Sequence, residues 1–206
     1  MIATVDAYYD FRSPYAYFAN HRIREGSFAL PPSATWQWRP VSIDALLNVQ
    51  AGRDAWAPYV DPLSAPKRAH LIADVRRNAA FYGAPLRAPK PPRQNSVSAL
   101  CIAASLDPEG HDGFRNAVFD ALWQEQRDIG DANVLAACLV RAGRDPALVD
   151  SALAPEARTA LADATTLAYA NGVFGVPTFA CNEEVFFGND RLDMLQWRLG
   201  QERARV

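Results

Sequence analysis

Hydrophobic and polar residues alternate at the start of the chain and predict a βαβ unit. Residues 2–9 alternate and include valine and tyrosine, which is typical of a strand. Residues 14–25 follow a helical pattern that ends beside Gly26. Residues 35–41 alternate again, and Pro40 is expected at the end of this second strand because an interior proline would remove a ladder hydrogen bond. A βαβ unit closes with a right-handed crossover.

The middle of the chain changes to helical periodicity. Residues 42–66 show few periodic signals and several helix breakers, so we expect a long irregular connection there. Residues 67–171 are almost entirely helical in pattern and carry no strand signal. The first helix stops at Gly83, and one of its faces is marked by Leu71, Val75, Asn78 and Tyr82. Further helices are predicted over residues 95–106, 114–123, 131–142 and 155–170.

Strand signals return after Gly172. Residues 178–181 and 185–187 are two short apolar runs, and a tight turn is expected between them at residues 182–184. A last helix follows, in which leucines repeat at helical spacing, namely Leu192, Leu195 and Leu199. The predicted order of elements is therefore β-α-β, a helical block, and β-β-α.

Charge and cysteine content exclude several kinds of function. The 206 residues carry a net charge of −2 and no basic stripe, so neither nucleic acid nor a membrane surface is expected as a partner. No apolar run is long enough to span a membrane, and the first residues do not resemble a signal peptide, so we expect a cytoplasmic protein. The cysteines are widely spaced without a CxxC motif, which predicts buried thiols and neither a disulfide nor a metal site for Cys101, Cys138 and Cys181.

Ser13 and Pro14 open the first helix and offer a place for an anion. Ser13 stands at the N-cap position and Pro14 at the first helical position. A phosphate, a carboxylate or a thiolate would be stabilised there by unpaired backbone N–H groups and by the positive end of the helix dipole. A serine that only caps the helix is the alternative. No recognisable motif pairs Ser13 with a histidine or an aspartate, so a serine hydrolase is not expected.

Two later segments also carry candidate binding residues. A Gly-Val-Pro-Thr sequence places Pro177 just before a strand, and a cis bond there costs about 0.5–1 kcal/mol. A cis bond would leave the Val176 N–H and C=O free to pair with an extended peptide, whereas a trans proline at the start of an edge strand is the alternative. Further on, Asn189 or Asp190 can cap the last helix, or Asp190 can bind the ammonium group of a ligand.

Four segments together resemble the glutathione-dependent 2-hydroxychromene-2-carboxylate isomerases. This family is related to the kappa-class glutathione transferases and to the DsbA-type disulfide oxidoreductases. The resemblance covers nearly the whole chain, and the segments that carry it are 10–17 (DFRSPYAY), 81–86 (FYGAPL), 172–179 (GVFGVPTF) and 186–192 (FFGNDRL).

The resemblance implies an α/β architecture, namely a thioredoxin-like fold with a large all-helical insertion and a cis bond at Pro177. We expect residues 1–65 and 172–206 to form the two parts of the thioredoxin-like domain and residues 66–171 to form the helical insertion domain. In DsbA-like relatives the position of Ser13 holds the nucleophilic cysteine of a CxxC motif. The loop here reads Ser-Pro-Tyr-Ala, so thiol–disulfide exchange at this site is excluded.

The resemblance also implies glutathione as a cofactor and assigns residues to it. Ser13 is the implied catalytic residue and contacts the sulfur, Val176 beside Pro177 pairs its backbone with the cysteinyl part, and Asn189 and Asp190 hold the γ-glutamyl end. The implied reaction is cis–trans isomerisation of an aromatic ring-cleavage product through reversible addition of the thiolate. A kappa-class-like glutathione S-transferase and a non-catalytic binding protein are the alternatives. The family also implies a homodimer.

The residues that would meet a substrate carboxylate depart from the family pattern. That pattern has basic residues after the second strand, whereas residues 43–49 contain no lysine. A solvated surface charge is the alternative reading for each of the nearest basic candidates, which are Arg39, Arg53, Lys67 and Arg68. Core packing, in preference to an aromatic pocket, is expected for Trp36, Trp38 and Trp56.

Overall fold

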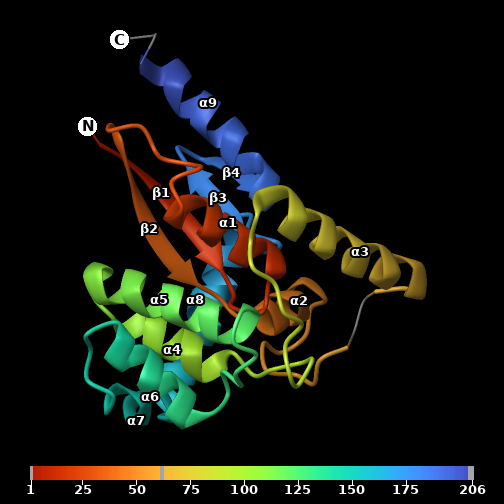
Figure 1. Cartoon of the computed structure of the whole chain (residues 1–206), viewed down its shortest axis with the longest axis vertical. Coiled ribbons are helices and arrows are strands. Elements are labelled where there is room, and N and C mark those ends of the chain that lie inside the picture. Colours follow the sequence, from red (N-terminus) through yellow and green to blue (C-terminus); the bar gives the residue numbers. More distant parts are fainter. Residues whose placement is uncertain (1, 61–62, 204–206) are drawn as a thin grey trace.

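A mixed four-stranded sheet lies at the centre of the molecule (Figure 1). The computed structural model describes residues 2–60 and 63–203. The strand order is β2-β1-β3-β4, in which β1 and β2 are parallel and the other two neighbouring pairs are antiparallel. The strands are β1 (Ala3–Tyr9), β2 (Ala34–Pro40), β3 (Thr178–Cys181) and β4 (Glu184–Phe187).

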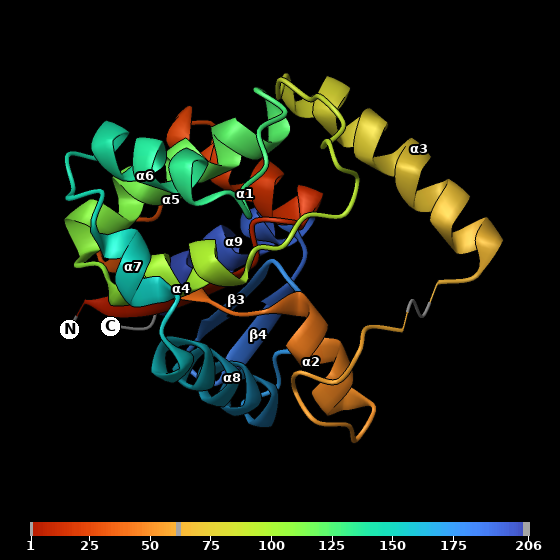
Figure 2. The same cartoon turned by 90° about the horizontal axis from the view of Figure 1, so that it is seen from below.

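Helices pack on this sheet, and α2 to α8 lie in the connection between β2 and β3. Figure 2 shows that α4, α5, α6 and α7 gather together, whereas α3 runs apart from them; α3 packs against α1. The helices are α1 (Pro14–Arg24), α2 (Ile43–Gln50), α3 (Ala65–Tyr82), α4 (Val97–Ser105), α5 (Pro108–Trp123), α6 (Ala132–Arg141), α7 (Leu148–Ala152), α8 (Pro155–Ala170), the 3-10 helix η1 (Asn189–Arg191) and α9 (Leu192–Arg203). The thioredoxin-like order of elements with a helical insertion is therefore confirmed.

Alternation along β1 determines which helices each face of the sheet contacts. Val5 and Ala7 are fully buried and pack with residues of α1 and α9. Tyr8 points to the other face, where it packs with residues of α2 and α8. Because successive strand residues point to opposite faces, this one central strand carries both layers of helices.

The predicted irregular connection over residues 42–66 is wrong at its start, because α2 occupies Ile43–Gln50. Ser42 caps this helix, and its Oγ accepts a hydrogen bond from the Ala45 N–H at 3.3 Å. Eight residues are too few to show a clear helical period. The usable signals are the Ser42 cap and Gly52, which follows the helix with a φ of +68°.

The β3–β4 hairpin is tighter than predicted. β4 begins at Glu184, one residue earlier than expected, and Cys181 pairs with Glu184 across the turn. The two turn residues, Asn182 and Glu183, have φ values of 49° and 67°. Two consecutive positive φ values are typical of a two-residue type I′ turn, in which glycine is usual at the second position. Because glutamate stands there instead, the sequence signal for the turn length is weak.

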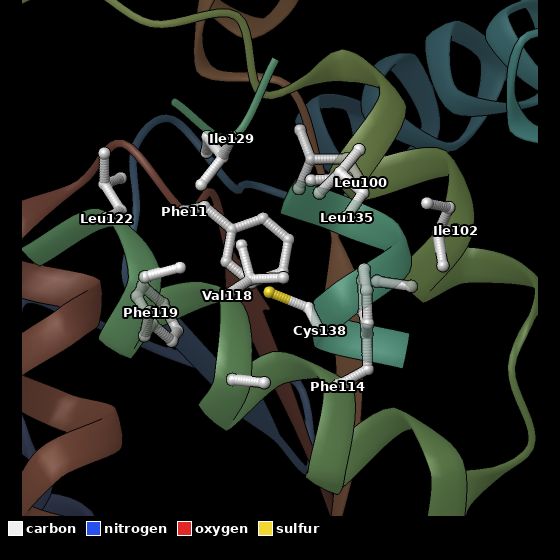
Figure 3. Close-up of a cluster of buried hydrophobic side chains, with 14 of the residues drawn as sticks. Phe11, Leu100, Ile102, Phe114, Val118, Phe119, Leu122, Ile129, Leu135 and Cys138 are labelled. Atoms are coloured by element: carbon white, nitrogen blue, oxygen red, sulfur yellow. The ribbon is translucent and has the colours of Figure 1, made fainter. Parts of the chain in front are cut away.

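A large buried cluster joins the loop after β1 to the helical block (Figure 3). Phe11 lies inside it with 0% exposure, and its ring packs edge-on against Phe119 and Phe114 at centroid distances of 5.1 Å and 6.4 Å. Val118 and Cys138 lie beside the same ring in Figure 3. Because Phe11 is two residues before Ser13, this core fixes the chain where α1 begins.

The cysteines follow the prediction of buried thiols. All three fall within the described residues, and they are buried with no disulfide between them. Across residues 2–60 and 63–203, none of the helices combines the length and the apolar character that a bilayer span demands.

Candidate active site

Ser13 uses its hydroxyl for two hydrogen bonds at the start of α1. Its backbone is extended, with φ −79° and ψ 115°, and its Oγ accepts from the Ala16 N–H at 3.2 Å, which is the N-cap contact predicted from the sequence. The same hydroxyl donates to the Val176 carbonyl oxygen at 3.1 Å, although the two residues are 163 positions apart. Ser13 is 4% exposed. The structure therefore brings the first two predicted site residues into direct contact.

Val176 and Pro177 form the wall opposite Ser13. The peptide bond between them is cis. The prediction that both backbone groups of Val176 are unpaired is wrong for the carbonyl, because the Ser13 hydroxyl donates to it. The Val176 N–H, in contrast, makes no hydrogen bond within residues 2–60 and 63–203. Val176 is 5% exposed, and a backbone donor without an acceptor is rare in such a residue, so the carbonyl of a bound molecule would suit it.

Asn189 and Asp190 are neighbours in the chain with different surroundings. Asn189 is 3% exposed, its Nδ2 donates to the Asn78 Oδ1 at 3.3 Å, and its carbonyl accepts from Arg22 at 2.8 Å. The Asp190 side chain is 60% exposed and pairs with Arg191 at 3.3 Å. Asn189 thus holds η1 against α3 and α1, whereas the Asp190 carboxylate remains accessible.

Gly188 explains how the chain turns into these two residues. Its φ is +110°, in the region that favours glycine, and a Cβ atom there would lie 2.5 Å from the Asp190 Oδ1. The Gly188 N–H donates to the Pro177 carbonyl at 2.9 Å. This bond ties the segment with Asn189 and Asp190 directly to the cis peptide.

A hydrogen-bonded chain that the sequence analysis missed links α1, α3 and η1. The Tyr15 hydroxyl donates to the Asp74 carboxylate at 2.6 Å, and Asn78 donates to the same oxygen at 3.0 Å. Asn78 in turn accepts from Asn189. Burial and then the Asp74 contact raise the pKa of Tyr15, and the Tyr15 hydrogen bond lowers the pKa of Asp74. The negative charge of Asp190 adds a smaller contribution that also raises the pKa of Tyr15.

Asp10 is a second residue that the sequence analysis missed. It is 0% exposed, and its two oxygens accept from the backbone N–H groups of Arg12 and Ile43, each at 2.9 Å. One carboxylate therefore fixes the turn before Ser13 and the first residue of α2. A fully buried carboxylate is stabilised only by such partners, so Asp10 supports the shape of the site.

The basic residues named as carboxylate candidates lie in different places. Arg39 donates to Asp6 of the neighbouring strand at 2.8 Å. Arg53 donates to the Pro58 carbonyl at 3.5 Å, and Lys67 is exposed near the start of α3. Arg68 lines a cavity together with Arg12. The predicted packing against the core is observed for Trp36, Trp38 and Trp56.

Known proteins match this chain in sequence and in fold over nearly its full length. The family model of the DSBA-like thioredoxin domain matches residues 4–200. A 2-hydroxychromene-2-carboxylate isomerase of Sphingobium xenophagum is 32% identical over 203 residues, which are 95% of this chain and 97% of that protein. The chain belongs to this isomerase family. We therefore classify the protein as an enzyme of the isomerase class.

Other members and solved structures agree with this isomerase family. A 2-hydroxychromene-2-carboxylate isomerase of Pseudomonas putida is 29% identical over 198 residues, covering 96% of this chain and 94% of that protein. A solved 2-hydroxychromene-2-carboxylate isomerase structure superimposes with a TM-score of 0.81 at 26% identity, covering 98% of this chain and 97% of that one. The cytosolic disulfide reductase DsbM from Pseudomonas aeruginosa, at 14% identity, covers 98% of this chain and 100% of its own with a TM-score of 0.67, and shares the fold alone.

Proposed function

We propose that this protein is a glutathione-dependent cis–trans isomerase that acts on 2-hydroxychromene-2-carboxylate or a related aromatic ring-cleavage product. The observation that carries the proposal is the contact between the Ser13 hydroxyl and the Val176 carbonyl beside the cis bond to Pro177. The names of the relatives supply the reaction and the substrate class.

The residues present fit the tripeptide. The Val176 N–H, which has no acceptor in the described part of the chain, suits the cysteinyl carbonyl of glutathione. The Asp190 carboxylate suits the γ-glutamyl ammonium group, and Asn189 fixes the segment that carries it. A structure of DsbM, which shares the fold, was solved with GSH. Because the Ser13 hydroxyl contacts Val176, we assign Ser13 to the sulfur of the same cysteinyl group.

Ser13 would activate the cofactor as a hydrogen-bond donor. When bound, glutathione supplies a thiolate that adds reversibly to a conjugated carbon of the substrate, so that the former double bond can rotate. An ordinary thiol has a pKa of about 8.5, and lowering it by one unit takes about 1.4 kcal/mol of preference for the anion. One hydrogen bond to a charged acceptor provides about that much. The N-terminus of α1, where Ser13 is the cap, favours the same anion.

The test of this proposal compares two capping serines. Ser13→Ala should lower isomerase turnover more than tenfold while glutathione still raises the melting temperature. Ser42→Ala is the matched control, because Ser42 is also a buried N-cap but caps α2. Equal turnover in the two variants would remove Ser13 from the mechanism. Mass spectrometry separates an isomerase, which returns free glutathione, from a transferase, which leaves a conjugate.

The domain division, a homodimer and a cytoplasmic location belong to the same proposal. The two-part thioredoxin-like domain and the helical insertion remain assigned to residues 1–65, 172–206 and 66–171. Exposed apolar side chains on α3 support a second copy as a partner, since Ile72 is 51% and Phe81 is 82% exposed. Sedimentation equilibrium of the purified protein, with Phe81→Asp as the variant, tests the dimer.

A further inference from the structure

The loop of residues 174–177, which contains the cis peptide bond, is held through its carbonyl groups. The Phe174 carbonyl accepts a hydrogen bond from the Gln50 side chain at 2.7 Å, and the next carbonyl along the chain accepts one from the Thr178 hydroxyl at 2.6 Å. The two carbonyls after that accept from the Ser13 hydroxyl and from the backbone N–H just before η1, at 3.1 Å and 2.9 Å. Donors from α2, β3, the start of α1 and the segment before η1 therefore fix this loop together.

The N–H groups of the same loop are left for a ligand. Among residues 2–60 and 63–203, no acceptor meets the N–H groups of Phe174, Gly175 and Val176. A loop with engaged carbonyls and open donors favours a bound molecule that brings acceptors. The place where the Val176 N–H meets such a molecule then depends on the bonds that hold the loop.

The helix α2 contacts both walls of the candidate active site. At its start, the Ile43 N–H donates to one oxygen of Asp10, and the other oxygen of this carboxylate accepts from the turn before Ser13. At its end, the Gln50 side chain reaches the Phe174 carbonyl. The two ends of one short helix are therefore tied to the serine and to the loop opposite it.

One face of α2 is turned toward the loop. Leu46 is fully buried and shares a hydrophobic cluster with Val173 and Val176. Gln50 follows Leu46 by four residues, and residues at this spacing lie on the same face of a helix. The helix also packs against α8, which leads into the loop (Figure 2). An apolar contact and a polar contact from the same helix face thus act on the loop.

The bond from Gln50 differs from the others in its exposure. It lies at the surface, whereas the Ser13 bond is buried and the Thr178 bond is partly buried. Removing an exposed hydrogen bond leaves no unsatisfied group in the core, so it costs little stability. Gln50 is therefore the donor whose loss should move the loop without unfolding the protein.

We propose that Gln50 is a positioning residue for glutathione, which acts through the Phe174 carbonyl and sets where the Val176 N–H lies. The role toward glutathione rests on the proposed function, whereas the hold of Gln50 on the loop does not. Ser13, and not Gln50, is assigned to the sulfur. Gln50 should therefore control the affinity for glutathione more than the turnover of the bound complex.

The first test needs no glutathione. Chymotrypsin cleaves after aromatic residues, and Phe174 is 50% exposed, so mass spectrometry of timed digests reports how often the loop opens. Gln50→Met removes the donor and keeps the length of the side chain, so cleavage after Phe174 should become about three- to tenfold faster. Cleavage after Phe81, which lies on α3 and is 82% exposed, is the internal reference and should keep its rate.

The second test titrates glutathione by calorimetry. Gln50→Met should bind glutathione about three- to tenfold more weakly. The melting temperature and the turnover at saturating glutathione should stay close to those of the original protein, which a general loss of structure would not allow. Gln196→Met is the matched control for both tests, because it removes another exposed glutamine bond, to the Ala29 carbonyl at 3.1 Å.

Three results would overturn the inference. They are unchanged cleavage after Phe174 in Gln50→Met, unchanged glutathione affinity in a variant that is cut faster, and equal losses of affinity in the Gln50→Met and Gln196→Met variants. A different result separates the two proposals. If the original protein does not bind glutathione, faster cleavage in Gln50→Met alone would support the hold of Gln50 on the loop and reject the glutathione-dependent function.

Discussion

The two sides of the candidate active site are built in different ways. On one side, Ser13 and Val176 are 4% and 5% exposed and are joined by a hydrogen bond. On the other, the Asp190 side chain is 60% exposed and pairs with Arg191, whose side chain is 48% exposed. Buried polar groups depend on protein partners for their geometry, whereas exposed ion pairs contribute little to stability and exchange with solvent. We expect the buried side to control folding and turnover and the exposed side to control affinity.

Phe11→Ala should have the largest effect, because it empties the core beneath the buried side. Truncation of a fully buried phenylalanine costs about 3–5 kcal/mol, and the Phe11 ring packs edge-on against three other aromatic rings. Urea denaturation measures the loss. Leu153→Ala is the control, because Leu153 is 62% exposed and its truncation should change stability by less than about 0.5 kcal/mol. Similar losses in both variants would contradict the division into two sides.

Ser13→Ala should have the next largest effect, on turnover more than on folding. Loss of a helix cap costs about 1 kcal/mol, which is the cost expected for Ser42→Ala because Ser42 caps α2. Ser13→Ala also loses the hydrogen bond to the Val176 carbonyl, worth about 1 kcal/mol more, so it should melt slightly below Ser42→Ala. An activity assay should separate them, with a loss of more than tenfold in Ser13→Ala alone.

A pH-dependent loss of stability should follow from His111, which lies in the buried region. Its Nε2 is 2.9 Å from the Tyr9 hydroxyl, and burial lowers its pKa below 6.5. The unfolded chain therefore takes up a proton before the folded chain does, and stability should fall as the pH drops below about 6.5. The pKa of Asp112 is also lowered, so its contribution is lost only at more acidic pH.

Urea denaturation between pH 7.5 and 5.5 measures this effect. His111→Asn should flatten the dependence, because the group that titrates is gone. His70→Asn is the control, since His70 is exposed on α3 and its removal should leave the slope unchanged. A slope that survives in His111→Asn would assign the effect to another group.

Asp190→Asn should have the smallest effect on folding and a measurable one on glutathione. The exposed pair with Arg191 is worth at most about 1 kcal/mol, so the melting temperature should barely move. Glutathione should bind several-fold more weakly, because its ammonium group loses a charged acceptor. Arg191→Gln is the control for the pair itself. Unchanged glutathione affinity in Asp190→Asn would remove this residue from the binding site.

Local signals predicted the elements whose ends are marked by caps and turns. Ser13 and Pro14 mark the start of α1, and the apolar runs around the hairpin mark β3 and β4, because the physical causes lie within a few residues of the effect. The sequence did not reveal the helix α2, because eight residues are too few to show a helical period, although Ser42 marked its start. Fold class and order of elements were therefore accessible from the sequence.

The support of the site was not accessible, because it depends on contacts between distant segments. Asp10 accepts from Ile43 across 33 residues, Tyr15 donates to Asp74 across 59, and Arg93 reaches Asp44 across 49. No periodicity or motif within one segment reports such pairs. The proline-rich segment likewise gave no sign that Arg93 would lie beside Asp44 and Tyr59.

The Ser13 hydroxyl has one hydrogen, which it already donates to the Val176 carbonyl oxygen. A sulfur anion that captures it would release the oxygen, which then becomes an acceptor for the cysteinyl N–H of the same tripeptide. The sulfur and the N–H of the cysteinyl group would therefore bind together, because the contact of the sulfur with Ser13 frees the Val176 carbonyl for the N–H. An analogue in which alanine replaces the cysteine offers no sulfur to begin the exchange, and should lose more affinity than one missing contact explains.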